Sequence, residues 1–411
     1  MAKGWPNITG LLLITILMLN LPVNCCWAAE NSASDEVVTG SARELRIYRG
    51  VWMTALAMEF MMGEKYHSIS DIETLREDGV NIVGMAVRVI VEEDGNLNTE
   101  IFNSYLQAIK KAMSKYHKEG FEVFLTLEVT YGEEGGEPLP VPKEITEKPS
   151  FIEQYNSLVL ELAKVAQEYN VEVFAPTLEP DRYLGGVEFA AKWCQEILPM
   201  VREHYKGKVM VRLAFQDIAL QKIDFNIEGY DILGICIYPF EDARVSREKV
   251  KLFIDEALRL AEKYGVPQVT AESGIWGEAL KASLSEETKA EALRVLFEEG
   301  EGRLDGFFIF DPPVSMHWSL KGSLAEQVIR EWYTERLLEP ARLEVSSLSI
   351  SPSKARLGED VEIQVEVSNI GEKPGMKELT LKINGETEEI KTVTVEGGEK
   401  ETVVFKLSIP E

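Results

Sequence analysis

The sequence of 411 residues has little histidine and cysteine, and it has far fewer basic than acidic residues. The formal net charge of −26 argues against a nucleic-acid partner, because the phosphates would be repelled. Of the four histidines, His117 and His204 lie in helical patterns, so a histidine-based metal cluster is not expected. Carboxylate-bound Mg²⁺ or Ca²⁺ stays an alternative, but we expect no metal and no cofactor.

The chain also lacks a disulfide framework and a nucleotide-binding motif. Cys194 lies in a helical pattern and Cys236 in an apolar strand pattern, so we expect two separate buried thiols. A disulfide between them remains the alternative for an exported protein. No Gly-x-Gly-x-x-Gly or P-loop pattern follows the first apolar segment, which argues against nucleotide binding.

The N-terminus has the pattern of a signal peptide. Lys3 supplies positive charge, the apolar segment 11–23 is short for a membrane-spanning helix, and small residues for cleavage follow it. We therefore expect residues 1–29 to be a signal peptide, 30–44 to be a flexible linker, and the protein to be secreted. Lipidation at Cys25 or Cys26 and an uncleaved membrane anchor are alternatives, although the residues before Cys25 depart from the usual lipidation motif.

Eight short apolar segments alternate with helical patterns in the next part of the chain. They are rich in Val, Ile and Phe and almost continuously apolar, as is typical of strands buried on both faces. In chain order they are GVWMTAL, VNIVGMAVRV, FEVFLTLEV, VEVFAPTLE, KVMVRLAF, YDILGICIY, PQVTAES and GFFIFDPP. Eight strand–helix units favour a (β/α)8 TIM barrel over an open α/β sheet. We expect this barrel at residues 45–339.

Two of the helical segments carry signals for their ends. Ser150 and Glu153 have the spacing of a capping box, which predicts a helix start at this point. Gly265 lies at a predicted helix C-cap, and Pro267 opens the next apolar segment.

A different pattern covers residues 340–411. Apolar and polar residues alternate, as at Val361, Ile363 and Val365, and turn residues separate the alternating segments. We therefore expect a small antiparallel β-sandwich. The segment GEDVEIQVEVSNIGE, residues 358–372, resembles the core of the CARDB-type immunoglobulin-like modules of exported prokaryotic proteins. We expect this module to lack its closing strand.

Charged or hydroxyl-bearing side chains end six of the predicted strands. In a TIM barrel the C-terminal ends of the strands meet at one mouth, where the reacting groups lie. Burying an unpaired carboxylate is costly, so several of them converging on one mouth indicate a site. In chain order these residues are Arg88, Glu128, Glu179, Tyr238, Glu272 and Asp311.

A single carboxylate at a strand end also has a simpler interpretation, as a solvated boundary residue or a helix N-cap. Glu179 precedes Pro180, which suits a helix start. Glu272 fits this interpretation less well, because the loop that follows it, Gly-Ile-Trp-Gly, places an aromatic residue near the acid.

The order of these residues resembles that of the clan A glycoside hydrolases, retaining enzymes built on (β/α)8 barrels. Leu178-Glu179-Pro180 matches two of the three residues of the Asn-Glu-Pro motif that follows strand four in that group, and Glu272 ends strand seven. The resemblance covers the barrel. It implies that Glu179 is the acid/base and that Glu272 is the nucleophile.

The same resemblance implies that Tyr238 touches the nucleophile and that Arg88 pairs with it. Both residues would stabilise ionised Glu272 and lower its pKa. Glu179, close to that negative charge, would have a raised pKa and hold a proton. A retaining mechanism requires the two carboxyl groups to lie about 5–5.5 Å apart.

Aromatic and polar residues near the strand ends are candidates for sugar binding. Aromatic rings stack on sugar rings, but a tryptophan at such a position is as consistent with packing. The candidates are Trp276, Trp318, Trp52, His317, Glu128 and Asp311.

Leu178 departs from the motif, since the clan A enzymes have asparagine there. An apolar side chain cannot hydrogen-bond the sugar 2-hydroxyl, a contact that contributes several kcal/mol at the transition state. Three explanations are open. Another residue supplies this contact, for which Asn81, Glu128 and Gln216 are the candidates. Otherwise the substrate differs at carbon 2, or the protein is a weakly active or inactive relative.

Two functions therefore fit the sequence. The first is a secreted retaining β-glycosidase that hydrolyses a poly- or oligosaccharide by double displacement. The second is a non-catalytic carbohydrate-binding protein of the cell surface, built on the same barrel and motivated by Leu178 and the C-terminal module. A metal-dependent barrel hydrolase has little support with so few histidines.

Overall fold

The chain divides into two units, a barrel unit at Arg46–Leu337 and a second unit that contains Leu338–Glu411. The computed structural model describes residues 14–19, 47–52, 59–61, 63, 68–132, 139–275, 284–311, 319–352, 359–383 and 386–408. Among these residues, no helix is long and apolar enough to cross a membrane.

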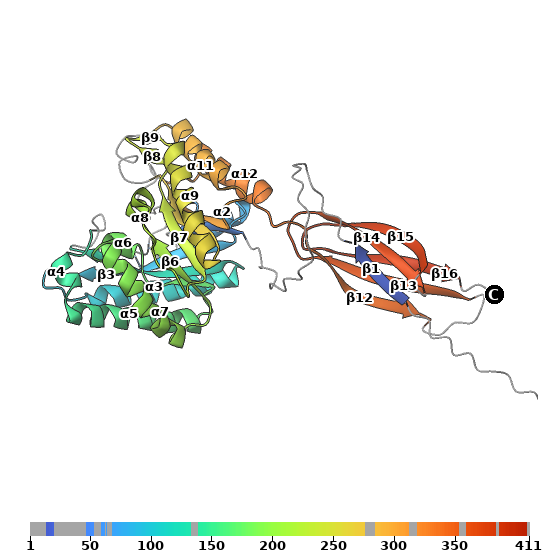
Figure 1. Cartoon of the computed structure of the whole chain (residues 1–411), viewed down its shortest axis with the longest axis horizontal. Helices are drawn as coiled ribbons and strands as arrows, with labels where there is room; N and C mark the ends of the chain where they lie inside the picture. Colours follow the sequence, from blue (N-terminus) through green and yellow to red (C-terminus); the bar gives the residue numbers. More distant parts are fainter. Residues whose placement is uncertain are drawn as a thin grey trace, which may run out of the picture. The chain divides into compact units, whose positions relative to one another are not determined.

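Eight parallel strands close into a barrel in the first unit (Figure 1). Each strand pairs with its neighbours in chain order, and the last strand pairs with the first. The strands are β2 (Tyr48–Trp52), β3 (Ile82–Val91), β4 (Glu122–Tyr131), β5 (Val173–Ala175), β6 (Lys208–Leu213), β7 (Ile232–Ile237), β10 (Gln268–Gly274) and β11 (Gly306–Phe310). Each predicted apolar segment overlaps one of them, so the predicted TIM barrel is confirmed.

Helices surround the barrel and cover the outer faces of its strands (Figure 1). Because both faces of the sheet are covered, strands such as β7 and β11 are buried at every position, which explains their continuous apolar sequences. The helices are α2 (Ile72–Glu77), α3 (Thr99–Lys118), α4 (Lys143–Thr146), α5 (Pro149–Glu168), α6 (Pro180–Tyr183), α7 (Val187–His204), α8 (Gln216–Gln221), α9 (Arg247–Tyr264), α11 (Glu286–Gly300), α12 (Leu324–Glu331) and the π-helix η1 (Trp332–Arg336). A short hairpin, β8 (Phe240–Glu241) and β9 (Arg244–Val245), follows β7.

The helix ends agree with the sequence at one position and differ at another. Gly265 is the C-cap of α9 in the left-handed conformation, with φ of 67°, as predicted. The predicted capping box at Ser150 is wrong, because α5 already begins at Pro149 and Lys148 is its N-cap. Proline suits the first helical position, since its fixed φ is helical and the N–H it lacks would have no partner there.

The second unit is a β-sandwich of two three-stranded antiparallel sheets. One sheet has the order β12 (Leu343–Ser351), β13 (Asp360–Asn369), β16 (Lys400–Ser408), and the other β1 (Ile14–Leu19), β14 (Gly375–Ile383), β15 (Glu386–Val395). Alternate residues of β13 and β14, such as Val361, Ile363, Val365 and Leu381, form the buried core, which confirms the predicted sandwich.

Strand β1 lies within the predicted signal peptide and pairs with β14. This pairing therefore exists only in a chain that keeps its first residues. Cleavage of the signal peptide stays a prediction, as does the resemblance of the sandwich to CARDB-type modules.

Candidate active site

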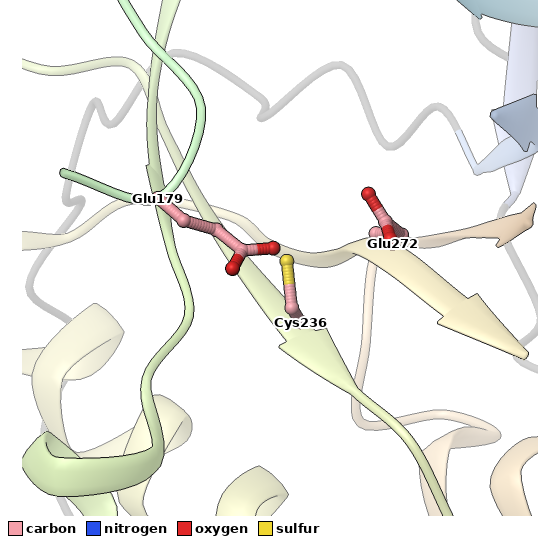
Figure 2. A group of neighbouring side chains, drawn as sticks. All are labelled: Glu179, Cys236 and Glu272. Atoms are coloured by element: carbon pink, nitrogen blue, oxygen red, sulfur yellow. The ribbon is translucent and has the colours of Figure 1, made fainter. Parts of the chain in front are cut away.

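Glu179 lies in the loop between β5 and α6, at the C-terminal end of its strand. It occupies the N-cap position of α6, but its side chain makes no capping hydrogen bond. Its backbone is left-handed, with φ of 40°, which is strained for a glutamate and more so before Pro180. Glu179 therefore does stand at a helix start, as its place before Pro180 suggested, but its side chain does not cap that helix and is directed instead toward Cys236 (Figure 2).

Glu272 lies on β10, next to an irregularity in that strand. The pairing register of β10 with β7 shifts between Thr270 and Glu272. Such irregularities re-aim a side chain and are frequent beside active sites. Glu272 is 8% exposed, and Glu179 is 4% exposed.

The side chains of Glu179 and Glu272 lie near each other, with the thiol of Cys236 between them (Figure 2). One carboxylate oxygen of Glu179, one of Glu272 and the sulfur of Cys236 all lie within 4.8 Å of one another. A separation of about 5 Å is the one that a retaining glycosidase requires, while inverting enzymes need about 6.5–9.5 Å. The geometry predicted for the pair is therefore present.

Glu272 has charged and hydroxyl partners. The hydroxyl of Tyr238, just after β7, donates to one of its oxygens, as the sequence predicts. The guanidinium of Arg212 on β6 donates to the other oxygen. Arg212 is 1% exposed and lies over the ring of Trp52, 3.8 Å from the ring centre. Glu272 thus has one buried cation beside it.

The prediction that Arg88 pairs with the nucleophile is corrected by this arrangement. Arg88 on β3 pairs instead with Glu128 on β4, at 2.7 Å. The two residues are direct register partners on adjacent strands, so their side chains meet without crossing the barrel. The role at Glu272 belongs to Arg212.

The environment raises the pKa of both catalytic candidates. Burial is the first cause for Glu179, the negative charge of Glu272 is the second, and together they raise its pKa to about 7. Burial also raises the pKa of Glu272, but Arg212 and Tyr238 act in the opposite direction. The expected lowering of the pKa of Glu272 is therefore wrong in its net direction. The two glutamates still differ, because Arg212 and Tyr238 stabilise the ionised form of Glu272 and not that of Glu179 to the same degree.

Two of the predicted sugar-binding residues have structural roles instead. Trp52 is 1% exposed on β2 and packs inside the barrel, beneath Arg212 and against Phe124. Asp311, at the end of β11, is fully buried. Its carboxylate accepts hydrogen bonds from the backbone N–H groups of Ile69 and Leu320 and from the hydroxyls of two serines. It holds two loops together.

The remaining predicted residues divide into two groups. Glu128 is buried at the site, and its charge acts on Glu272. Trp276, His317 and Trp318 lie outside the described residues, and their proposed contacts with sugar stay predictions.

The structure also places the candidates for the sugar 2-hydroxyl contact. Leu178 is buried, and its backbone N–H donates to Leu127. Asn81 immediately precedes β3, at the opposite end of the barrel, where it bonds Arg49 and Ile47. Gln216 is exposed at the start of α8. Glu128 is the candidate that lies at the site.

Three residues of the site were not identified from the sequence. Arg212 interrupts an apolar strand, which is a usable signal, since a cation inside a barrel strand requires a partner. Cys236 was expected only to be a buried thiol, and both Cys194 and Cys236 are indeed free and buried. Asp181 accepts hydrogen bonds from the backbone of Ala214 and Phe215 and so ties the loop of Glu179 to the end of β6.

Glu179, Cys236 and Glu272 are also the group, among the described residues, that has the spacing for a metal ion. Arg212 already supplies a positive charge to Glu272. A cation would have to displace it or lie against it, so the expectation of no metal stays as it was.

No protein-family model and no curated protein sequence matches the chain. Among solved structures, a GH113 β-1,4-mannanase matches with a TM-score of 0.53 and 16% identity, over 71% of this chain and 100% of that chain. The GH113 β-mannanase from Alicyclobacillus acidocaldarius matches with a TM-score of 0.52 and 16% identity, over 71% of this chain and 98% of that chain. A family 5 xyloglucanase from Paenibacillus pabuli matches with a TM-score of 0.53 and 11% identity, over 71% of this chain and 99% of that chain. The barrel of this chain therefore has the fold of solved glycoside hydrolases.

Proposed function

We propose that the protein is a retaining β-glycosidase that hydrolyses a poly- or oligosaccharide by double displacement. The observation that carries the proposal is the buried pair Glu179 and Glu272, with carboxylate oxygens within 4.8 Å and different partners. The shared fold with glycoside hydrolases of families 113 and 5 supports it.

The two glutamates divide the chemistry according to their partners. Glu272, beside Arg212 and Tyr238, is the ionised nucleophile that attacks the anomeric carbon. Glu179, protonated near neutral pH, gives its proton to the leaving glycosidic oxygen as the bond breaks. In the second step Glu179 takes a proton from water, which attacks the anomeric carbon and releases Glu272.

The change of role at Glu179 follows from the charge of its neighbour. While Glu272 is ionised, its charge keeps the pKa of Glu179 high. Formation of the glycosyl ester removes that charge, so the pKa of Glu179 falls and the ionised form can act as a base.

We further propose a β-mannoside as the first substrate to test. Several structures with this barrel are named as β-mannanases or a mannosidase. Leu178 agrees with a substrate that differs at carbon 2, since mannose and glucose differ only in the configuration of that carbon.

The test uses Glu179→Gln, Glu272→Ala and an activated aryl β-glycoside. Both variants should lose turnover, and azide should partly restore the Glu272→Ala variant by attacking in place of the missing carboxylate. Glu256→Gln is the matched control, because Glu256 is equally buried but pairs with Arg259 on α9. It should keep wild-type activity.

A wild-type protein that binds glycans but hydrolyses nothing across a broad β-glycoside panel would refute the proposed glycosidase activity. Leu178 gives that outcome a specific meaning, because it removes a transition-state contact of the clan A motif. The protein would then be a carbohydrate-binding protein on a glycosidase-like barrel, which is the second candidate function.

We also propose that the protein is exported and that the CARDB-like sandwich associates with the cell surface. The positively charged and apolar start of the chain supports export. N-terminal sequencing of the mature protein checks it, and a protein that still begins at Met1 in the cytoplasmic fraction would refute it.

A further inference from the structure

Cys236 is a buried group of the site that the double-displacement mechanism leaves without a role. It lies on β7 as the register partner of Glu272 on β10, and register partners on parallel strands project to the same side of the sheet. Its sulfur lies within 4.8 Å of a carboxylate oxygen of Glu179, close enough for the thiol to act on the pKa of that carboxyl group. Figure 2 shows its sulfur directed at that group, with Glu272 on the other side.

We propose that Cys236 is a positioning residue, whose thiol donates to the carboxylate of Glu179 and holds it opposite Glu272. The proposal rests on the function proposed above. Glu179 needs such a contact, because its backbone is strained and its side chain makes no capping bond. The guanidinium of Arg182 is 3.9 Å away and more than half exposed, so it holds the carboxylate only weakly.

A thiol suits this place because it donates a hydrogen bond without adding charge. Burial, and then the charge of Glu179, raise the pKa of Cys236 well above the ordinary thiol value, so it stays protonated. An S–H group is a weaker donor than a hydroxyl. It therefore orients the carboxyl group while stabilising its ionised form less, which leaves Glu179 able to keep its proton.

Other charged and titratable groups also act on Glu179, and the test must separate them from Cys236. They come from the strands and from the short helix around the pair, namely Arg212, Tyr238, Glu272, Asp181, Arg182 and Tyr183. A substitution at Cys236 changes none of these groups, so a shift in the pKa of Glu179 reports the thiol contact.

The experiment compares Cys236→Ser, Cys236→Ala and the control Cys194→Ser in the full-length protein. Cys194 is equally buried and lies on α7, outside the pair. The pKa of Glu179 is measured by NMR with ¹³C-labelled glutamate, and kcat and KM are followed against pH with an aryl β-glycoside.

The serine variant should lower the pKa of Glu179 by about 0.5–1 unit, because a hydroxyl is the stronger donor to the ionised form. The basic limb of the kcat profile should move down with it. The alanine variant removes the donor, so it should raise the pKa and lower kcat about tenfold or more with little change in KM. Cys194→Ser should match the wild type.

The proposal is overturned if both Cys236 variants leave the pKa of Glu179 and the basic limb where Cys194→Ser leaves them. The serine variant is nearly isosteric, so a fold lost on alanine substitution does not prevent this test. The NMR measurement needs no turnover. If the Cys236 variants shift the pKa of Glu179 but the wild type hydrolyses no glycoside, the proposed function is refuted and the contact between Cys236 and Glu179 is supported.

Discussion

The charge of Glu272 should help to keep Glu179 protonated. Replacing Glu272 by glutamine measures how far this charge raises the pKa of Glu179. In the wild type the pKa of Glu179 is raised to about 7, first by burial and then by Glu272. Glu272→Gln keeps the shape of the side chain and removes its charge. The pKa of Glu179 should therefore fall.

The size of the fall follows from the geometry of the pair. For two unit charges no more than 4.8 Å apart, an effective dielectric constant of about 20 gives a repulsion of at least about 3 kcal/mol, or about 2 pKa units. Arg212 pairs with Glu272 and cancels part of this repulsion. We expect the pKa of Glu179 to fall by about 1–2 units and, because burial persists, to stay above its ordinary value.

The assay is an NMR titration of ¹³C-labelled glutamate in the full-length protein. The Glu179 signal is identified by its loss in Glu179→Gln. A second measurement uses the wild type with its nucleophile trapped as a glycosyl ester by a 2-fluoro sugar, which removes the same charge. Both routes should lower the pKa of Glu179 by a similar amount.

Two results would refute this reasoning. A wild-type pKa of Glu179 near 4.5 would mean that neither burial nor Glu272 acts on it as the structure indicates. A pKa near 7 that does not change in Glu272→Gln would assign the whole shift to burial. The change from acid to base during the reaction would then need another cause.

Three further predictions concern Arg212, Asp311 and the stability contributed by Glu179. Arg212→Met should lower kcat/KM at least about 100-fold and move the acidic limb of the pH–rate profile to higher pH, because breaking a buried ion pair costs about 3–5 kcal/mol. Arg212→Lys should lose less activity. A pH–rate profile of Arg212→Met that matches the wild type would contradict this prediction. Asp311→Ala should lower the free energy of unfolding by about 2–4 kcal/mol in urea titrations, because it leaves two buried backbone N–H groups without acceptors; an unchanged midpoint would contradict the loop-holding role. Because the pKa of Glu179 is raised, the stability that its protonated form contributes is complete below about pH 4.5 and falls by about 3 kcal/mol as the pH rises through about 7. Glu179→Gln cannot ionise, so its Tm should exceed that of the wild type at pH 8 and approach it at pH 5, and equal differences at both pH values would contradict the sign.

The fold followed from local patterns because each pattern has a direct physical cause. Strands buried on both faces must be apolar throughout, and each of the eight apolar segments became a barrel strand. The alternation at Val361, Ile363 and Val365 predicted one buried face, and those residues form the sandwich core. The helix start at Ser150 was wrong because Pro149 supplies a competing signal one residue earlier.

The site was predicted in part for the same reason. Carboxyl ends of parallel strands meet at one mouth, so Glu179 and Glu272 could be paired from their order in the chain. Their partners could not be paired in this way. Arg88 and Arg212 both interrupt apolar strands, and the sequence offers no means to decide which of them reaches Glu272.

The sequence by itself determined the barrel, the sandwich and the strands that carry the two glutamates. Only the tertiary structure decided that Arg212 and Cys236 lie beside the pair, that Trp52 packs beneath Arg212, and that Asp311 holds two loops together. The physical reason is that strand periodicity fixes the side toward which a residue points. Its height in the barrel and its neighbours across the interior depend on register and strand stagger, which arise only when the barrel closes.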